Sequence, residues 1–112
     1  DPQVEAALRL AREWSGDAPS KNELCKRLAI SRRSLEQRFR SAVGRSPMEE
    51  IRRLNLERAA EMLVATAEPI KSIALACGFS SLVHLSVAFR RAYGISPRSF
   101  RGRGRSAQRV GS

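Results

Sequence analysis

Residues 31–47 of this chain are repeated, fifty positions later, at residues 81–97. Within that block, which has no gaps, eight pairs are identical: Ser31 and Ser81, Leu35 and Leu85, Phe39 and Phe89, Arg40 and Arg90, Ala42 and Ala92, Gly44 and Gly94, Ser46 and Ser96, Pro47 and Pro97. The pairs include apolar core positions and residues that start or end helices. The repeat therefore predicts a duplicated unit: a short helix, a tight turn, a second helix ending in glycine, and a Ser-Pro helix start.

Apolar residues recur at every third or fourth position, and no alternating strand pattern persists, which predicts an all-α fold. Serines, prolines and glycines divide the pattern into seven helices, the first of which we expect to stop at Gly16. Ser20 and Glu23 have the spacing of a capping box at the start of the second helix. The expected helices cover residues 4–14, 20–28, 31–43, 47–67 and 69–77, then a sixth that starts at Ser80 or Ser81 and ends at Gly94, and a last turn or two from 97.

Each copy of the repeat has the outline of a helix-turn-helix. The second turn contains Gly78, which an offset of fifty aligns with Leu28 in the first copy. Alternating glycines are expected to prevent a helix in the tail and keep it flexible. The predicted division is a first helix-turn-helix subdomain at 1–46, a long linker helix at 47–67, a second helix-turn-helix subdomain at 68–101, and a flexible Arg/Gly tail at 102–112.

The chain is strongly basic, with 21 Lys and Arg against 11 Asp and Glu in 112 residues, a net charge of +10. Five of the arginines lie from Arg98 onward, where there is no acidic residue. This excess predicts a polyanionic partner, with double-stranded DNA as the first candidate. The plain alternative is a well-solvated basic surface.

Few residues are suited to other chemistry. Cys25 and Cys77 lie inside apolar helical patterns, and His84 is the single histidine, so we expect buried free thiols, a reducing compartment and no metal site. No nucleophile-base pair or phosphate-cradling glycine loop is recognisable, which argues against an enzyme or a bound cofactor. The apolar stretches are too short to cross a membrane.

The helix expected from Ser31 buries Leu35 and Phe39. The side chains that this turns outward are Arg32, Arg33, Glu36, Gln37, Arg40 and Ser41. The candidate base-reading residues are Arg32, Arg33, Glu36 and Gln37. In a major groove, Arg33 would pair with guanine and Gln37 with adenine, while Glu36 would accept from cytosine. The alternative is a solvated face on which Arg32 and Glu36 form an ion pair one turn apart.

The equivalent helix in the second copy is less polar. With Leu85 and Phe89 buried, its candidate base-reading residues are Val83, His84, Ser86 and Val87. Exposed valines suit contact with thymine methyl groups. Alternatively, Val83 and Val87 pack on a neighbouring helix or on a protein partner, which would make the chain a helical adaptor.

Other arginines are candidates for phosphate contacts rather than base contacts. They are Arg40, Arg45, Arg90, Arg91, Arg98 and Arg101. The Arg-Gly tail supplies an alternative function, nonspecific binding of RNA or of the nucleoid.

The long linker helix would span about 30 Å. Successive major grooves on one side of B-DNA are about 34 Å apart. A rigid helix of this length therefore would allow one chain to place both reading helices in adjacent grooves.

These features together resemble the DNA-binding domain of AraC/XylS-type bacterial transcription regulators. The resemblance covers residues 4–101 and is most specific at 69–80 (PIKSIALACGFS), 89–91 (FRR) and 94–101 (GISPRSFR). The blocks 31–39 and 44–47 are similar to the xylose-operon-regulator branch, whose members carry a sugar sensor before this domain.

The resemblance implies the output module of an effector-responsive regulator, an activator of carbohydrate genes, in the cytoplasm and associated with the nucleoid. It implies double-stranded DNA and RNA polymerase as partners, and no small molecule or membrane bound by this part of the protein. Three positions depart from the family pattern. Family members often have Phe at the position of Leu85 and Arg at the position of Val87. Many also have Arg at the position of Asn55, so the resemblance does not support a phosphate contact from Asn55.

Overall fold

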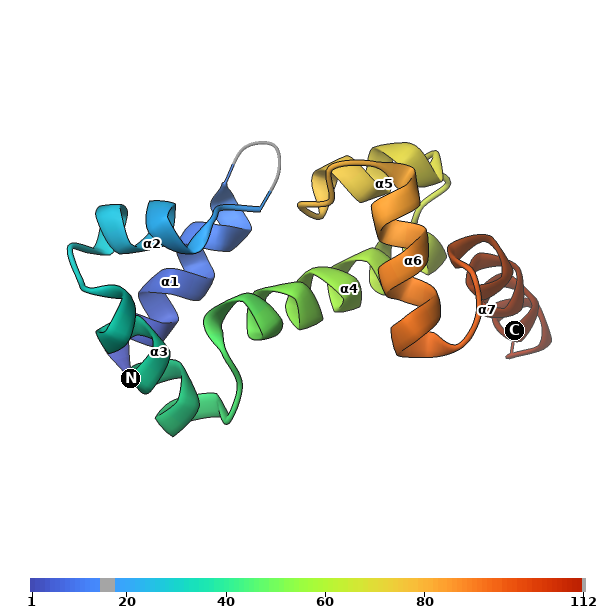
Figure 1. Cartoon of the computed structure of the whole chain (residues 1–112). Coiled ribbons are helices and arrows are strands. Elements are labelled where there is room, and N and C mark those ends of the chain that lie inside the picture. The colour runs from blue at the N-terminus through green and yellow to red at the C-terminus, as the bar shows by residue number, and fades with distance from the viewer. Residues whose placement is uncertain (15–17, 112) are drawn as a thin grey trace.

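A computed structural model describes residues 1–14 and 18–111 of the chain, with side chains described up to residue 104. In these residues the fold consists of seven helices and no strand, as the periodicity predicted. The body is elongated, 48 × 25 × 22 Å (Figure 1). The helices are α1 (Pro2–Glu13), α2 (Lys21–Leu28), α3 (Arg32–Val43), α4 (Pro47–Ala65), α5 (Ile70–Ala76), α6 (Leu82–Tyr93) and α7 (Pro97–Gly111).

Serine side chains start most of these helices. Ser20, Ser31, Ser46 and Ser81 each accept a hydrogen bond from the backbone N–H three residues later, at 3.0 to 3.2 Å. Glu23 returns a hydrogen bond to the N–H of Ser20 at 3.0 Å, which completes the predicted capping box. These caps satisfy backbone donors that the helix itself leaves unpaired, so the helix starts could be predicted from sequence.

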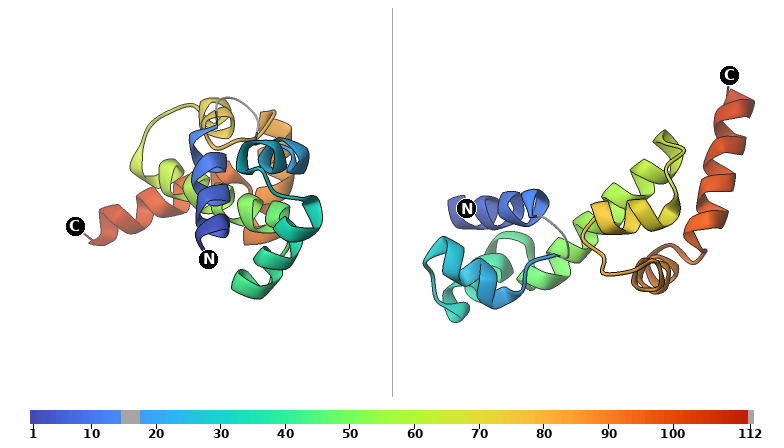
Figure 2. Two further views of the ribbon diagram at one scale, coloured as in Figure 1. Left: turned by 90° about the vertical axis from the view of Figure 1, so that its left-hand side faces the viewer. Right: turned by 90° about the horizontal axis from the view of Figure 1, so that it is seen from above.

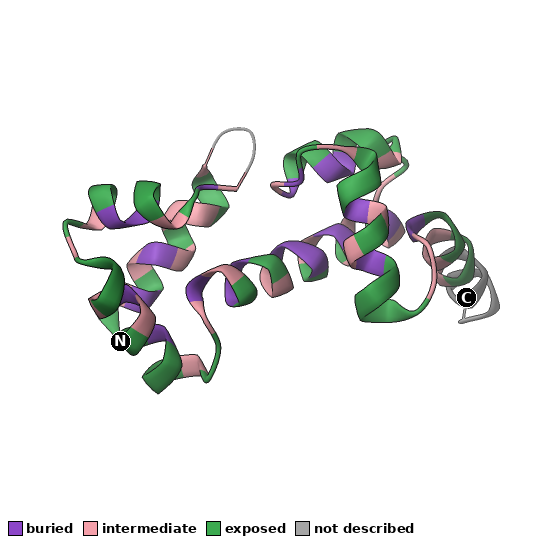
Figure 3. Ribbon diagram, viewed as in Figure 1, coloured by how far each residue is buried: buried purple, intermediate pink, exposed green. Residues whose placement is uncertain are grey.

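Two separate hydrophobic cores occupy the two ends of the molecule (Figure 3). Phe39 lies in the first and Phe89 in the second, and both are fully buried. We call α1–α3 the first lobe and α5–α7 the second lobe. Helix α4 serves both cores: Ile51 packs in the first, and its later residues Leu56, Ala59 and Leu63 pack in the second.

The two helix-turn-helix turns differ by one residue. In the first, Ala29 has a left-handed backbone (φ 55°), and the N–H of Ile30 donates to the carbonyl of Cys25 at 3.2 Å. In the second, Gly78 is left-handed (φ 85°), and the N–H of Phe79 donates to the carbonyl of Ala74 at 2.9 Å. The structural counterpart of Gly78 is therefore Ala29, and the predicted alignment with Leu28 is wrong. The repeat runs at an offset of 49 before the turn and 50 after it, because the second turn contains one extra residue.

The C-terminal segment also differs from expectation. Helix α7 continues to Gly111 instead of ending after a turn or two, so the prediction that glycines prevent a helix there is wrong for the described backbone. Gly104 explains how α7 packs beside α4: a Cβ at this position would lie 2.6 Å from Cγ2 of Val64. Close packing of this kind offsets the cost of glycine in a helix. The expected stop at Gly16 lies outside the described residues, and α1 already ends at Glu13.

Candidate nucleic-acid interface

The second helix of each helix-turn-helix lies on the same side of the molecule. Helices α3 and α6 both descend from the top toward the bottom of Figure 1, at opposite ends of α4. Seen from above in Figure 2, both lie on one side of α4, whereas α1 and the end of α7 lie on the other. One flat-sided or cylindrical partner can therefore meet both helices at once.

The outer face of α3 is as polar as the sequence predicted. Leu35 and Phe39 are fully buried, which fixes the rotation of the helix. The predicted residues left exposed are Arg32, Arg33, Gln37, Arg40 and Ser41. These side chains offer guanidinium and amide donors along the length of the helix.

Glu36 has a different environment from the one expected. Its carboxylate is half-buried and forms an ion pair with Lys21 at the start of α2. The alternative in which it pairs with Arg32 on α3 is wrong. Lys21 is a residue that sequence reasoning missed, since the pairing joins two helices whose crossing is set by tertiary packing.

The outer face of α6 is apolar, again as predicted. Val83 is 67% exposed and Val87 is 49% exposed, while Ser86 is half-buried. The exposed His84 ring contacts the hydroxyl of Ser80 through Nδ1. Ser80 stands in the longer second turn, so the first turn has no counterpart of this contact.

A groove of about 560 Å³ separates α6 from the first half of α4. His84, Val87 and Arg91 line its α6 side, and Arg52 is an exposed cation on its α4 side. The alternative in which the α6 valines face a neighbouring helix therefore applies in part to Val87. Arg52 was not singled out from the sequence, because membership of this groove depends on how α4 and α6 cross.

The predicted phosphate-binding arginines divide into two groups. Those that are exposed and carry no ion pair among the described residues are Arg40, Arg90, Arg91 and Arg98. Arg45 is exposed but donates to the buried Glu50 at 3.2 Å. Arg101 donates to the backbone carbonyls of Leu63, Thr66 and Glu68 at 2.9, 3.3 and 2.7 Å, so it caps the C-terminal end of α4.

Glu50 organises the arginines at the start of α4. Arg53 donates to its two carboxylate oxygens at 2.8 and 3.0 Å, and the same guanidinium reaches Glu57 at 2.6 Å. The hydrogen bonds from Arg53 hold the pKa of Glu50 below its usual value and raise the pKa of Arg53. Glu50 is therefore ionised at neutral pH and neutralises part of the local positive charge.

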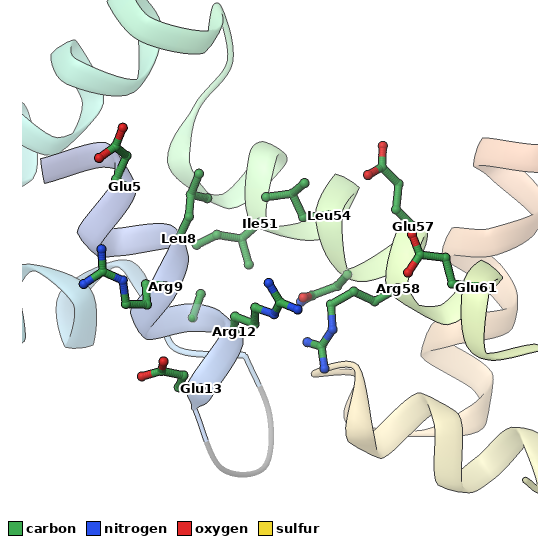
Figure 4. A pocket seen from close by; sticks show the side chains of 12 residues that line it. Glu5, Leu8, Arg9, Arg12, Glu13, Ile51, Leu54, Glu57, Arg58 and Glu61 are labelled. Atoms are coloured by element: carbon green, nitrogen blue, oxygen red, sulfur yellow. The ribbon is translucent and has the colours of Figure 1, made fainter. Parts of the chain in front are cut away.

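A second groove, of about 860 Å³, lies between α1 and α4 (Figure 4). Its floor includes Leu8 and Leu54. Its charged residues are mixed in sign: Arg9, Arg12 and Arg58 against Glu5, Glu13, Glu57 and Glu61. Because the four negative charges exceed the three positive ones, this groove is a poor site for a polyanion.

The described part of the chain offers no candidate metal cluster and no membrane-spanning helix. It contains no group of three or more His, Cys, Asp or Glu side chains placed to hold a metal ion. Cys25 and Cys77 are buried free thiols, as expected, and burial raises the pKa of Cys77. No helix among the described residues is long and apolar enough to cross a membrane.

Comparison with known proteins agrees with this geometry. The family model of a helix-turn-helix domain matches residues 24–103. A solved transcriptional regulator from Chromobacterium violaceum, described as an AraC-type DNA-binding domain-containing protein, superposes with a TM-score of 0.79 and 33% identity, covering 92% of each chain. The chain belongs to the AraC/XylS-type family of DNA-binding domains. Members of this family are parts of transcription regulators and not enzymes.

Another AraC-type structure shows a domain of this fold on its target. The DNA-binding domain of AdpA, a global transcriptional factor, was solved in complex with a target DNA, and it superposes with a TM-score of 0.82 and 29% identity over 95% of this chain and 92% of that one.

The curated relatives are longer proteins. The transcriptional regulator ArgR of Pseudomonas aeruginosa is 35% identical over 93% of this chain, which covers 32% of that protein. The xylose operon regulatory protein of Escherichia coli is 31% identical over 90% of this chain and 26% of that protein. The chain thus spans about a third or less of these two relatives. Since ArgR is the more identical of the two, these matches show the family without selecting the xylose branch.

Proposed function

We propose that this AraC-type domain binds double-stranded DNA in a sequence-specific manner by placing α3 and α6 in successive major grooves. The observation that carries the proposal is that both helices lie on one side of α4 (Figure 2). Helix α4 has 19 residues and is therefore about 28 Å long. With the width of the two lobes added, the 48 Å body is long enough to meet grooves about 34 Å apart.

The base contacts follow from the exposed donors and methyl groups. Arg33 pairs with guanine and Gln37 with adenine through two hydrogen bonds each, and Arg32 lies beside them. Glu36 accepts from cytosine with its charge moderated by Lys21. In the second groove Val83 and Val87 contact thymine methyl groups, while His84 and Ser86 supply polar contacts.

Phosphate contacts would hold the domain in register on the duplex. The free, exposed arginines Arg40, Arg90, Arg91 and Arg98 are retained for this role, and Arg52 in the groove between α4 and α6 joins them. Arg45 contributes less because Glu50 holds it, and Arg101 acts as a helix cap.

For the whole protein, we propose an effector-responsive bacterial regulator that activates carbohydrate genes through RNA polymerase. Support comes from two relatives whose names concern activation or sugar genes: the transcriptional activator RhaS of Escherichia fergusonii, 34% identical over 96% of this chain and 41% of that protein, and the xylose operon regulatory protein. Effector binding would reside in the part of such a protein that this chain does not match. The site of action is the nucleoid in the cytoplasm.

The test begins with selection of binding sites from random duplex DNA. The proposal expects two conserved half-sites about one helical turn apart. Arg33→Ala should then weaken binding by about 1–3 kcal/mol and relax base preference at one position of one half-site. Arg103→Ala, a change at an exposed arginine of α7 that is not a candidate base-reading residue, is the control and should weaken all sequences slightly and equally. Equal loss on selected and random DNA for Arg33→Ala would contradict base reading by α3.

A further inference from the structure

We infer that a small contact between the lobes, formed by Ala18, Asn55 and Gly78, fixes the rotation of α6 relative to α3 and thereby selects the spacing of the two half-sites. We call it the interlobe contact. The inference rests on the proposed function, because half-site spacing has meaning only if both helices read DNA.

The interlobe contact joins the lobes directly. The N–H of Ala18, which precedes α2, donates to the carbonyl of Gly78 in the second turn at 3.1 Å. Among the described residues, this is the hydrogen bond that connects the first lobe to the second without passing through α4. Nearby, Arg58 on α4 donates to the carbonyl of Ala76 at 3.3 Å, which ties the same turn to the central helix.

The interlobe contact is tightly packed. Asn55 of α4 is 93% buried, with a relative exposure of 7%. A Cβ built on Gly78 would lie 2.9 Å from Nδ2 of Asn55 and 3.4 Å from Cβ of Ala18. A methyl group there would force the Asn55 amide to move, so glycine suits the close approach as well as its left-handed backbone (φ +85°).

The position of the interlobe contact gives it control over geometry. The first core reaches α4 at Ile51 and the second begins at Leu56, so little more than one helical turn connects the two packed regions. Asn55 lies in that turn. The interlobe contact therefore resists bending and twisting of α4. Without it, the lobes would be joined by α4 alone.

Half-site spacing is sensitive to this rotation. Adding one base pair moves the second half-site by about 3.4 Å and turns it by about 35° around the duplex, since a helical turn holds 10–10.5 pairs. When a base pair is added, a domain with rigidly placed lobes loses the base contacts of α3 or of α6. A domain whose lobes can rotate relative to each other keeps both sets of contacts.

The chain supplies a matched pair of variants. Gly78→Ala combines an unfavourable left-handed backbone with the clash at Asn55. Gly94→Ala carries the same backbone cost (φ +79°) but meets nothing within 4 Å, so it isolates the clash. In the double variant Asn55→Ala with Gly78→Ala, removing the amide makes room for the new methyl group.

The first measurement is binding to a duplex selected by the wild-type protein, and to the same duplex with one base pair inserted or deleted between half-sites. We expect wild type and Gly94→Ala to prefer the selected spacing by tenfold or more. For Gly78→Ala the preference should fall below about threefold or move to another spacing, and the double variant should recover it. An equal preference in Gly78→Ala and Gly94→Ala would overturn the inference, as would a selection that yields no paired half-sites.

A second measurement needs no DNA. Arg40 and Arg90 are exposed and stand at equivalent positions on α3 and α6. Spin labels attached through Arg40→Cys and Arg90→Cys therefore report the distance between these helices. The native Cys25 and Cys77 are buried and should not react with the label. We expect a narrow distribution in wild type and Gly94→Ala, and a shifted or broadened one in Gly78→Ala. An unchanged distribution in Gly78→Ala would overturn the inference even where sequence-specific binding is confirmed. A changed distribution in a protein without sequence preference would instead contradict the proposed function.

Discussion

The two copies of the repeat place chemically different residues at one equivalent position of the fold. Glu50 in α4 and Phe100 in α7 stand fifty residues apart, at equivalent positions just after the Ser-Pro helix start. Near the start of α4, beside the first lobe, Glu50 is buried and accepts hydrogen bonds from Arg45 and Arg53. The position is therefore occupied by an ion-paired carboxylate in the first copy of the repeat.

In the second lobe, the equivalent position is aromatic. The ring of Phe100 lies 5.2 Å from that of Phe89 and 5.5 Å from that of Tyr93, and the Phe89 and Tyr93 rings stack at 4.4 Å. The residues shared by the two copies set the course of the backbone. We expect the residues that differ to determine how each lobe responds to pH and to core truncation, and which base it would read in the proposed complex.

Core truncation should have the largest effect and should differ between the lobes. Phe39→Ala and Phe89→Ala remove equivalent, fully buried rings, and each should lower the free energy of unfolding by about 3–5 kcal/mol. Phe89→Ala should cost about 1 kcal/mol more, because it also removes two aromatic pairs. Urea unfolding followed by far-UV circular dichroism measures both. A larger loss for Phe39→Ala would contradict this ranking of the two cores.

Acid should weaken the packing of α4 beside the first lobe through Glu50. Because hydrogen bonds from Arg53 lower the pKa of Glu50 in the folded chain, its stabilising effect is complete above pH 4.5, the ordinary value, and disappears as the pH falls below it. Glu50→Gln should cost about 1–3 kcal/mol at pH 7 and progressively less toward pH 3. Urea titrations followed by the fluorescence of Trp14, the single tryptophan, report on this lobe.

Glu57→Gln provides the control for this experiment. Its carboxylate also pairs with Arg53, at 2.6 Å, but its side chain is 50% exposed, so the change should cost less than about 1 kcal/mol. If Glu50→Gln and Glu57→Gln lower the free energy of unfolding equally and with the same pH profile, the burial of the Glu50 ion pairs adds nothing to stability.

Local signals explain why much of the fold could be predicted from sequence. A serine cap or a left-handed glycine acts within a few residues, so the helices starting after Ser31 and Ser81 and ending at Gly44 and Gly94 were predicted correctly. The rotation of α3 and α6 followed from their fully buried leucines and phenylalanines, and this placed the candidate reading faces.

Features that depend on contacts between helices were not predicted. Ala29 takes the left-handed position without being glycine, so no sequence signal marked the one-residue difference in length between the two turns. Arg101 was expected on phosphate but caps α4, a role that requires the end of α4 to lie beside α7. Helix α7 was expected to be short because of its glycines, yet Gly104 packs closely on Val64.

The smallest expected effect concerns the apolar face of α6, where Val87 stands at the position equivalent to Gln37. If Val87 covers a thymine methyl group, Val87→Ala should weaken binding about fourfold, because one of the two methyl groups that it removes would be buried against the base, at about 0.8 kcal/mol. Replacing thymine by uracil in the second half-site should cost wild type a similar factor and cost Val87→Ala almost nothing, because the two changes remove the same contact. The same replacement in the first half-site is the control and should affect both proteins equally. If the two changes instead reduce the affinity by independent factors, Val87 packs in the groove against α4 and does not contact the base. The two lobes would then differ in how they pack and not in the bases that they read.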